Sequence, residues 1–245
     1  MIPKIIHYCW FGRNPKPESV LRYIQTWKDK MPDFEIKEWN EDNFDIERLA
    51  FTREAYEKGK YAFVSDVARI YALINEGGIY FDTDVAVIKR IDDRLMRQSS
   101  FVGFEDESLV GTAIIASEPN HPFWIKFFSY YGKHKFILED NSLNMIPNVN
   151  ILTKMLMENG LLCNNSYQTI ENVTIYPKDY FSPKSYLTGK TKRTINTYTV
   201  HDFAGSWLPK APWYVKMEKR IWNSLGFSNK NVIAKTLKLL HVINK

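Results

Sequence analysis

The stretch that decides the fold is AFVSDVARIYALINEGGIYFDTDVAVI, residues 62–88. Its first half repeats apolar residues at the spacing of a helix that buries one face, namely Val64, Val67, Ala68, Tyr71 and Ile74. Gly77 and Gly78 then stop the helix, because glycine adopts the positive φ common at helix C-termini. The second half, IYFDTDVAVI, is rich in aromatic and β-branched residues. The segment therefore predicts a helix followed at once by a strand.

The residues before this stretch continue the alternation of strands and helices. KIIHYCW (4–10) and FEIKEW (34–39) predict short strands, and PESVLRYIQTWK (17–28) predicts a helix between them. Such alternation indicates an α/β sheet with crossovers, whose ligand crevice lies outside the carboxyl ends of the strands. At 245 residues the chain fits a single such domain.

Composition narrows the setting in which the chain works. Cys9 and Cys163 are too few for a disulfide framework and lack zinc-site spacing. The N-terminus has no leader pattern, and no apolar stretch approaches the length of a membrane span. We expect a cytoplasmic protein. Contact with the inner face of the cytoplasmic membrane is a second expectation.

Positive charge is concentrated at the C-terminal end. Residues 208–245 contain a single acid, Glu218, although the chain has 33 Lys and Arg against 28 Asp and Glu. We interpret this tail as a basic helical extension packed on a main domain of residues 1–207. The alternative is contact of residues 230–245 with an anionic membrane surface, because VIAKTLKLLHVI is amphipathic. No nucleic-acid-binding signature accompanies the charge, so nucleic acid is not an expected partner.

Two aspartates, Asp82 and Asp84, end the apolar strand. In extended chain, residues two apart share a side, so we expect both carboxylates to face the crevice together. Paired carboxylates repel, and a divalent cation removes that cost while offering a site for a diphosphate. Oxygen ligands favour Mn²⁺ or Mg²⁺ over zinc. The simpler alternative is that the aspartates only begin a turn.

The preceding helix carries a polar face of its own. Asp66 and Arg69 are three residues apart and share a face, with Ser65 at its edge. The simplest interpretation is an ion pair within the helix, of small energetic value. Its position directly before the Asp82 strand favours a functional role.

At this point the sequence resembles a known family. IPKIIHYCWFG, MPDFEIKEWNEDN, SDVARIYALINEGGIYFDTDV and VHDFAGSW together resemble the DXD-containing glycosyltransferases of family 32, which include capsular and outer-chain sugar transferases. The order of blocks is more distantly similar to the catalytic domains of glucosylating toxins. The resemblance covers residues 2–207 and implies a GT-A-type, Rossmann-like α/β fold with a mostly parallel central sheet, in which residues 1–207 form the catalytic domain.

The resemblance also implies a reaction and its partners. The expected reaction is metal-dependent transfer of a sugar, with retention of anomeric configuration, in surface polysaccharide synthesis of the capsular or lipopolysaccharide type. The donor would be a nucleotide-sugar, with a UDP-sugar favoured and a GDP-sugar as the alternative. The acceptor would be a saccharide or a lipid-linked saccharide, and the cofactor Mn²⁺ or Mg²⁺.

Roles for individual residues follow from the same resemblance. Asp66 and Arg69 would contact the donor sugar. Asp82 would meet the ribose or a metal-bound water, and Asp84 would ligate the metal, with His201 completing the metal shell. The remaining residues would bind the nucleotide or the departing diphosphate; they are Ile6, His7, Trp10, Ser65, Ser206 and Trp207. Packing is the alternative for Trp10, and a satisfied buried histidine is the alternative for His7.

Other acids and other functions stay open on the sequence. Glu105 and Asp106 are candidates for an acceptor-side role, with a solvated acidic loop as the alternative. The segment MIPNVNILT has Ile146 where the family commonly has glycine, so the acceptor-side loop departs from the family pattern. FDTDV also resembles the first motif of haloacid-dehalogenase phosphohydrolases, in which Asp82 would be the nucleophile. A nucleotide-sugar or glycan-binding module without turnover is the second competing function.

Overall fold

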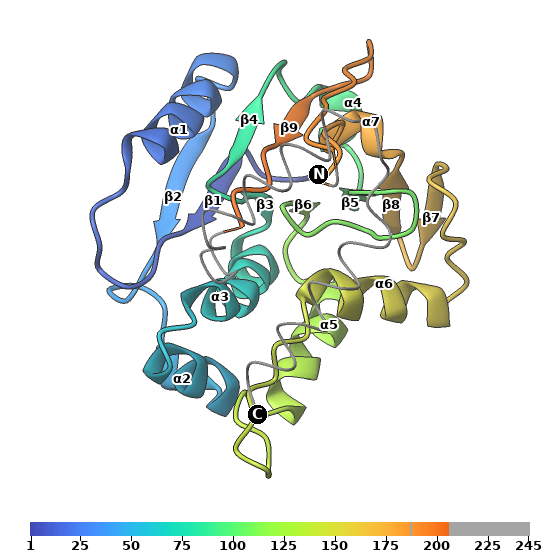
Figure 1. Ribbon diagram of the computed structural model, residues 1–245. Coiled ribbons are helices and arrows are strands. Elements are labelled where there is room, and N and C mark those ends of the chain that lie inside the picture. Colours follow the sequence, from blue (N-terminus) through green and yellow to red (C-terminus); the bar gives the residue numbers. More distant parts are fainter. Residues whose placement is uncertain (187, 206–245) are drawn as a thin grey trace.

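The alternation predicted from the sequence forms one seven-stranded sheet with helices on both faces (Figure 1). The structure is a computed structural model that describes residues 1–186 and 188–205. The strands are β1 Ile5–Cys9, β2 Glu35–Trp39, β3 Gly78–Phe81, β4 Val85–Val87, β5 Ser100–Gly103, β6 Ile114–Ser117, β7 Gln168–Ile170, β8 Val173–Tyr176 and β9 Thr199–His201. The helices are α1 Glu18–Lys30, the 3-10 turn η1 Ile46–Arg48, α2 Ala50–Glu57, α3 Tyr61–Glu76, α4 Asp93–Met96, α5 Pro122–Lys133, α6 Asn148–Glu158 and α7 Lys178–Phe181.

The central sheet has the order β2-β1-β3-β6-β5-β8-β7. Strands β2, β1, β3, β5 and β8 point the same way, and β6 and β7 run against them. The α/β class and the mostly parallel central sheet predicted from the sequence are confirmed. A separate ladder pairs β4 with β9.

Two glycines fix the junction between α3 and β3. Gly77 and Gly78 have φ values of 64° and 101°, a region that disfavours residues with a Cβ. A Cβ on Gly78 would also lie 2.6 Å from the carbonyl oxygen of Ile5 in β1. The two glycines therefore end the helix and allow β3 to pair closely with β1, which fixes where β3 ends.

The predicted strand IYFDTDVAVI is two strands, and this part of the prediction is wrong. β3 ends at Phe81, and the amide of Val85 donates to the carbonyl of Asp82 at 3.1 Å, which closes a turn. β4 then leaves the central sheet and pairs with β9. The indole Nε1 of Trp27 donates to the Val85 carbonyl at 2.8 Å and holds β4 against α1. Asp82 and Asp84 thus sit on a turn between two sheets.

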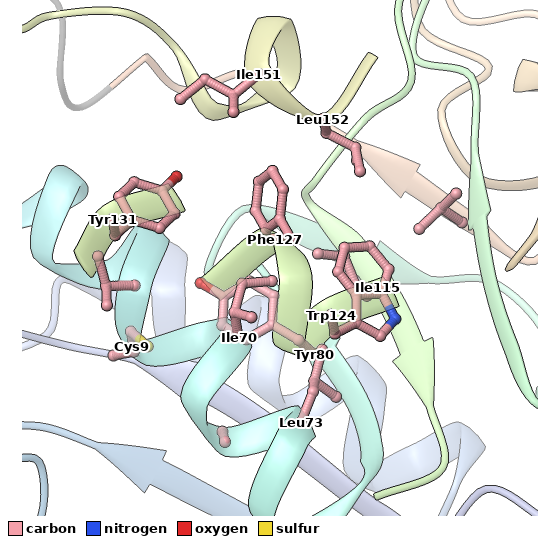
Figure 2. Close-up of a cluster of buried hydrophobic side chains, with 14 of the residues drawn as sticks. Cys9, Ile70, Leu73, Tyr80, Ile115, Trp124, Phe127, Tyr131, Ile151 and Leu152 are labelled. Atoms are coloured by element: carbon pink, nitrogen blue, oxygen red, sulfur yellow. The ribbon is translucent and has the colours of Figure 1, made fainter. Parts of the chain in front are cut away.

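Alternate side chains of β3 enter two separate cores. Tyr80 joins the core under α2, α3, α5 and α6, whereas Ile79 and Phe81 join the core under α1, α4 and α7. Figure 2 shows Phe127 of the first core between side chains of α3 and α6. Truncating a fully buried aromatic of this size costs about 3–5 kcal/mol of stability. The two cores therefore hold β3, and the turn after it, in a fixed position.

The structure bears on two predictions, about the C-terminal tail and the membrane, only through its described residues. The basic extension 208–245 and its proposed contact segment 230–245 lie outside the part of the chain that the structure describes. Across residues 1–186 and 188–205, no helix combines the length and the apolar character needed to cross a bilayer.

Candidate active site

The turn after β3 brings Asp82 and Asp84 beside His201 of β9. His201 pairs with Val85 in the β4–β9 ladder, and its Nε2 lies 3.3 Å from Asp84 Oδ1. One potential ligand atom from each of Asp82, Asp84 and His201 lies within 4.8 Å of the other two. The predicted sharing of one side by Asp82 and Asp84 therefore exists, but it results from the turn and the β9 neighbour.

The backbone after β9 holds Asp84 in place. The amide of Ala204 donates to Asp84 Oδ2 at 2.7 Å, and the amide of Asp202 donates to the Asp84 carbonyl at 3.0 Å. Asp202 itself accepts from Lys184 Nζ at 2.6 Å and from the Tyr23 hydroxyl. Asp84 Oδ2 is thus hydrogen-bonded to backbone, and Asp84 Oδ1 faces His201.

The donor set of this cluster fits a hard divalent cation. Two carboxylates and one imidazole are acceptable ligands for Mn²⁺ or Mg²⁺. The Nδ1 atom of His201 is buried and has no hydrogen-bond partner among the described residues. Burial alone would raise the pKa of Asp84, but its hydrogen bond to His201 and the charge of His201 lower that pKa. The arrangement keeps Asp84 ionised, as a metal ligand must be.

Arg69 joins Asp66 to Asp82. Its Nη2 lies 2.9 Å from Asp66 Oδ1 and 3.2 Å from Asp82 Oδ1, and its Nη1 donates to the Thr112 carbonyl at 2.8 Å. The guanidinium stacks over the Tyr80 ring at 4.5 Å, and the Tyr80 hydroxyl donates to Asp82 Oδ1 at 2.9 Å. The ion pair expected within α3 exists, but it also reaches across to β3. Arg69 is therefore held rigidly between the two acids.

Asp66 is deeply buried and is also held by a residue that the sequence analysis did not identify. Burial raises the pKa of Asp66 to about 7, against the opposing effect of Arg69. Asn148, the first residue of α6, donates from Nδ2 to Asp66 Oδ1 at 2.6 Å. The Thr112 hydroxyl donates to Asn148 Oδ1 at 2.8 Å. Asn148 follows Pro147 in the segment that departs from the family pattern, and that departure was its one signal in the sequence.

The predicted nucleotide-binding residues are distributed unevenly around this cluster. Trp10 is partly exposed just after β1, and its Nε1 donates to the Asn14 carbonyl at 2.7 Å. Ile6 and His7 are fully buried in β1. Ser65 is partly buried; its hydroxyl donates to the Tyr61 carbonyl. Ser206 and Trp207 lie outside the described residues, so their predicted roles stay predictions.

His7 is occupied by structural hydrogen bonds. Its Nε2 lies 2.7 Å from the Gly77 carbonyl, and its Nδ1 accepts from Trp39 Nε1 at 3.0 Å. Burial lowers the pKa of His7, and this pattern of partners requires the neutral ring. The structure therefore does not bring the His7 side chain to the metal cluster; it places His7 under the Gly77 junction.

The two acids of the β5–β6 loop differ in their surroundings. Asp106 Oδ1 accepts from the amides of Ser108 and Leu109, at 2.7 Å and 2.8 Å, and so closes the loop. Glu105 is partly buried, and burial raises the pKa of its carboxyl to about 7. The geometry gives Asp106 a local structural role and leaves Glu105 as the acid near the cluster.

Comparisons with known proteins relate the chain to glycosyltransferases. Residues 17–102 match the family model described as a glycosyltransferase sugar-binding region containing a DXD motif. An uncharacterized glycosyltransferase of Acanthamoeba polyphaga mimivirus is 26% identical over 85% of both chains. Two mannosyl phosphorylinositol ceramide synthases of Saccharomyces cerevisiae are each 28% identical over 56% of this chain, and the match covers only 38% and 37% of their own length.

Two solved glycosyltransferases show a more distant likeness. The PaToxG glycosyltransferase has 18% identity and a TM-score of 0.47, over 65% of this chain and 72% of that chain. A glycosyltransferase involved in glycosylation of the major capsid of PBCV-1 has 10% identity and a TM-score of 0.46, over 82% and 95%. The family model and the sequence relatives confirm the resemblance to DXD-containing glycosyltransferases, and we conclude that the chain is a glycosyltransferase.

Proposed function

We propose that this chain is a metal-dependent, retaining glycosyltransferase that moves a sugar from a nucleotide-sugar donor to a saccharide acceptor. The observation that carries the proposal is the single connected cluster of Asp66, Arg69, Asp82, Asp84 and His201. A metal site and a rigid arginine meet at Asp82. A nucleotide-sugar needs both, because its diphosphate requires a cation and its sugar requires oriented hydrogen-bond partners.

The proposed metal ligands are Asp82, Asp84 and His201, with Asp82 free to act through a bound water. A divalent cation held there would stabilise the negative charge that develops on the diphosphate as it leaves. The Ala204 amide and His201 fix the two Asp84 oxygens, which orients that ligand before the donor binds. Such orienting contacts commonly change metal affinity 10- to 100-fold.

Asp66 and Arg69 are proposed to bind the hydroxyl groups of the donor sugar. Both side chains are buried and form an ion pair with each other, so their remaining hydrogen-bonding groups have fixed directions. Fixed partners hold the anomeric carbon where the acceptor oxygen can reach it, and they do so without the entropy loss of ordering mobile side chains. Ser65 contributes through its backbone, since its carbonyl accepts from Arg69 Nε at 3.3 Å.

Nucleotide and diphosphate contacts complete the proposal. Trp10 would stack on the base, with backbone of the Ile6–His7 region beneath it, and Ser206 and Trp207 would contact the diphosphate. Retention is supported by the resemblance alone. It would use either a carboxylate nucleophile or attack from the face of the departing phosphate.

Donor and acceptor identity are further parts of the proposal. The toxin resemblance favours a UDP-sugar, whereas the names of the yeast relatives support a mannosyl group, so GDP-mannose is the second candidate. The resemblance to capsular enzymes supports a saccharide or lipid-linked saccharide acceptor in surface polysaccharide synthesis, at the inner face of the cytoplasmic membrane. The matched relatives themselves are viral and fungal.

The proposal is tested by turnover with a panel of UDP- and GDP-sugars in Mn²⁺. At least one donor should raise the melting temperature and be consumed, and NMR of the released sugar should show the retained anomer. Asp84→Asn should abolish turnover with little change in melting temperature, whereas Asp106→Asn should remain active. Phosphate release from simple phosphate esters with an aspartyl-phosphate at Asp82 would support the phosphohydrolase instead. Donor binding without any turnover would support the binding module.

A further inference from the structure

A further acidic side chain, Glu105, lies on the hairpin whose backbone contacts Arg69 and Asp82. Glu105 follows β5 in the hairpin that leads to β6, where its amide donates to the Leu109 carbonyl at 2.8 Å. Its carboxylate accepts no hydrogen bond and forms no ion pair with any residue in the described part of the chain. Glu105 is partly buried, and its oxygens are not among the buried polar atoms that lack a partner, so they stay accessible from solvent. A ligand in the site could therefore reach a carboxylate that no protein group uses.

The loop is shaped to give this carboxylate room. A Cβ on Gly111, directly across the hairpin, would lie 3.2 Å from Glu105 Oε2 and 3.0 Å from Glu105 Cβ. Gly111 has no positive φ, so its backbone conformation alone does not require glycine. The glycine is therefore explained by the space that the Glu105 side chain occupies.

The residues next to Gly111 hold the proposed sugar-binding groups. The Thr112 carbonyl accepts from Arg69, and the Ala113 carbonyl accepts from the amide of Asp82 at 2.9 Å. Glu105 consequently borders the strip of backbone that positions Arg69 and Asp82. Burial raises the pKa of the Glu105 carboxyl, the charge of His201 lowers it, and the charges of Asp106 and Asp82 raise it.

We propose that the carboxylate of Glu105 binds a hydroxyl group of the transferred sugar. The inference rests on the proposed function, since it needs a nucleotide-sugar in the site. A sugar hydroxyl is a neutral donor, which a carboxylate without a protein partner binds well. Asp66 and Arg69 would hold the sugar from α3, and Glu105 would hold it from the β5–β6 hairpin.

The experiment compares binding of a nucleotide-sugar with binding of the same nucleotide without its sugar. Calorimetry in Mn²⁺ gives dissociation constants for GDP-mannose and GDP, and for UDP-glucose and UDP, with wild type, Glu105→Ala and Glu105→Gln. Glu105→Ala should weaken the nucleotide-sugar roughly 10- to 100-fold, the range expected for loss of a charged hydrogen bond, and leave the nucleoside diphosphate unchanged. Glu105→Gln should lie between, because its amide oxygen still accepts a hydrogen bond.

Two further variants separate this role from a structural one. Gly111→Ala should displace the carboxylate and reproduce the selective loss, and Asp106→Asn, in the same loop, should bind both ligands like wild type. The melting temperature of Glu105→Gln should equal or exceed that of wild type, because an unpaired carboxylate is removed.

Each other outcome overturns the inference. Equal nucleotide-sugar affinity in wild type and Glu105→Ala would overturn the inference while the proposed function stands. Parallel loss of nucleotide-sugar, nucleotide and Mn²⁺ affinity would assign Glu105 to the metal site or to the fold instead. Failure of wild type to bind any nucleotide-sugar would overturn the proposed function and the inference together.

Discussion

Replacing Asn148 with alanine removes the contact that holds Asp66 from the side of α6. The bond from Asn148 Nδ2 to Asp66 Oδ1 is 2.6 Å long, and only 7% of Asn148 is exposed, so water cannot easily replace it. A hydrogen bond to a charged group is worth about 1.5–3 kcal/mol. At about 1.4 kcal/mol per factor of ten, kcat/KM for the donor should fall roughly 10- to 100-fold.

The assay is consumption of the best donor in Mn²⁺, measured as kcat and KM separately. Asn150→Ala is the matched control, because Asn150 lies on the same helix and is exposed. Thr112→Val removes only the hydroxyl that Asn148 accepts, and we expect a smaller loss. If Asn148→Ala retained the kcat/KM of Asn150→Ala at unchanged melting temperature, the claim that Asp66 must be held in one orientation would be refuted.

The remaining predictions concern Tyr80 and His7. Tyr80→Phe removes the 2.9 Å hydrogen bond to Asp82 but keeps the ring under Arg69. Mn²⁺ affinity, measured by calorimetric titration, should therefore fall about tenfold. Unchanged Mn²⁺ affinity would show that Tyr80 does not support the metal site. Burial lowers the pKa of His7 below 6.5, so His7 binds a proton more readily in the unfolded chain than in the folded protein. The stabilising contribution of the neutral His7 ring is therefore complete above pH 6.5 and is lost as the pH falls below 6.5. The free energy of unfolding should therefore fall less steeply below pH 6.5 in His7→Gln than in wild type, and equal slopes would contradict the neutral, buried ring.

Local patterns explain how much of the fold could be predicted. The boundaries of α3 were predictable because the apolar spacing and the pair Gly77–Gly78 act within one segment. The turn at Asp82–Asp84 was only the alternative interpretation, because VAVI continues the apolar pattern beyond the aspartates. What ends β3 there is the pairing of Val85 with His201, a long-range contact.

The candidate site shows the same division. Asp66 and Arg69 lie three residues apart on α3, so their proximity could be inferred from helix geometry. Asp82 and Asp84 were also expected to share a side, but a turn and not an extended strand brings them together. Asn148 meets Asp66 across 82 residues, and no periodicity predicts such a contact. His201 was found only through the family resemblance, because a single histidine in a strand carries no signal of its own.

The measurement that tests the account most directly is Mn²⁺ binding to the protein without donor, followed by electron paramagnetic resonance or calorimetry. Wild type should bind one Mn²⁺, and addition of UDP or GDP should tighten that binding. Asp84→Asn and His201→Ala should each weaken Mn²⁺ at least about tenfold, with melting temperatures of the metal-free proteins near that of wild type. Equal Mn²⁺ affinity in wild type and both variants would contradict the claim that Asp82, Asp84 and His201 form the metal site of a glycosyltransferase.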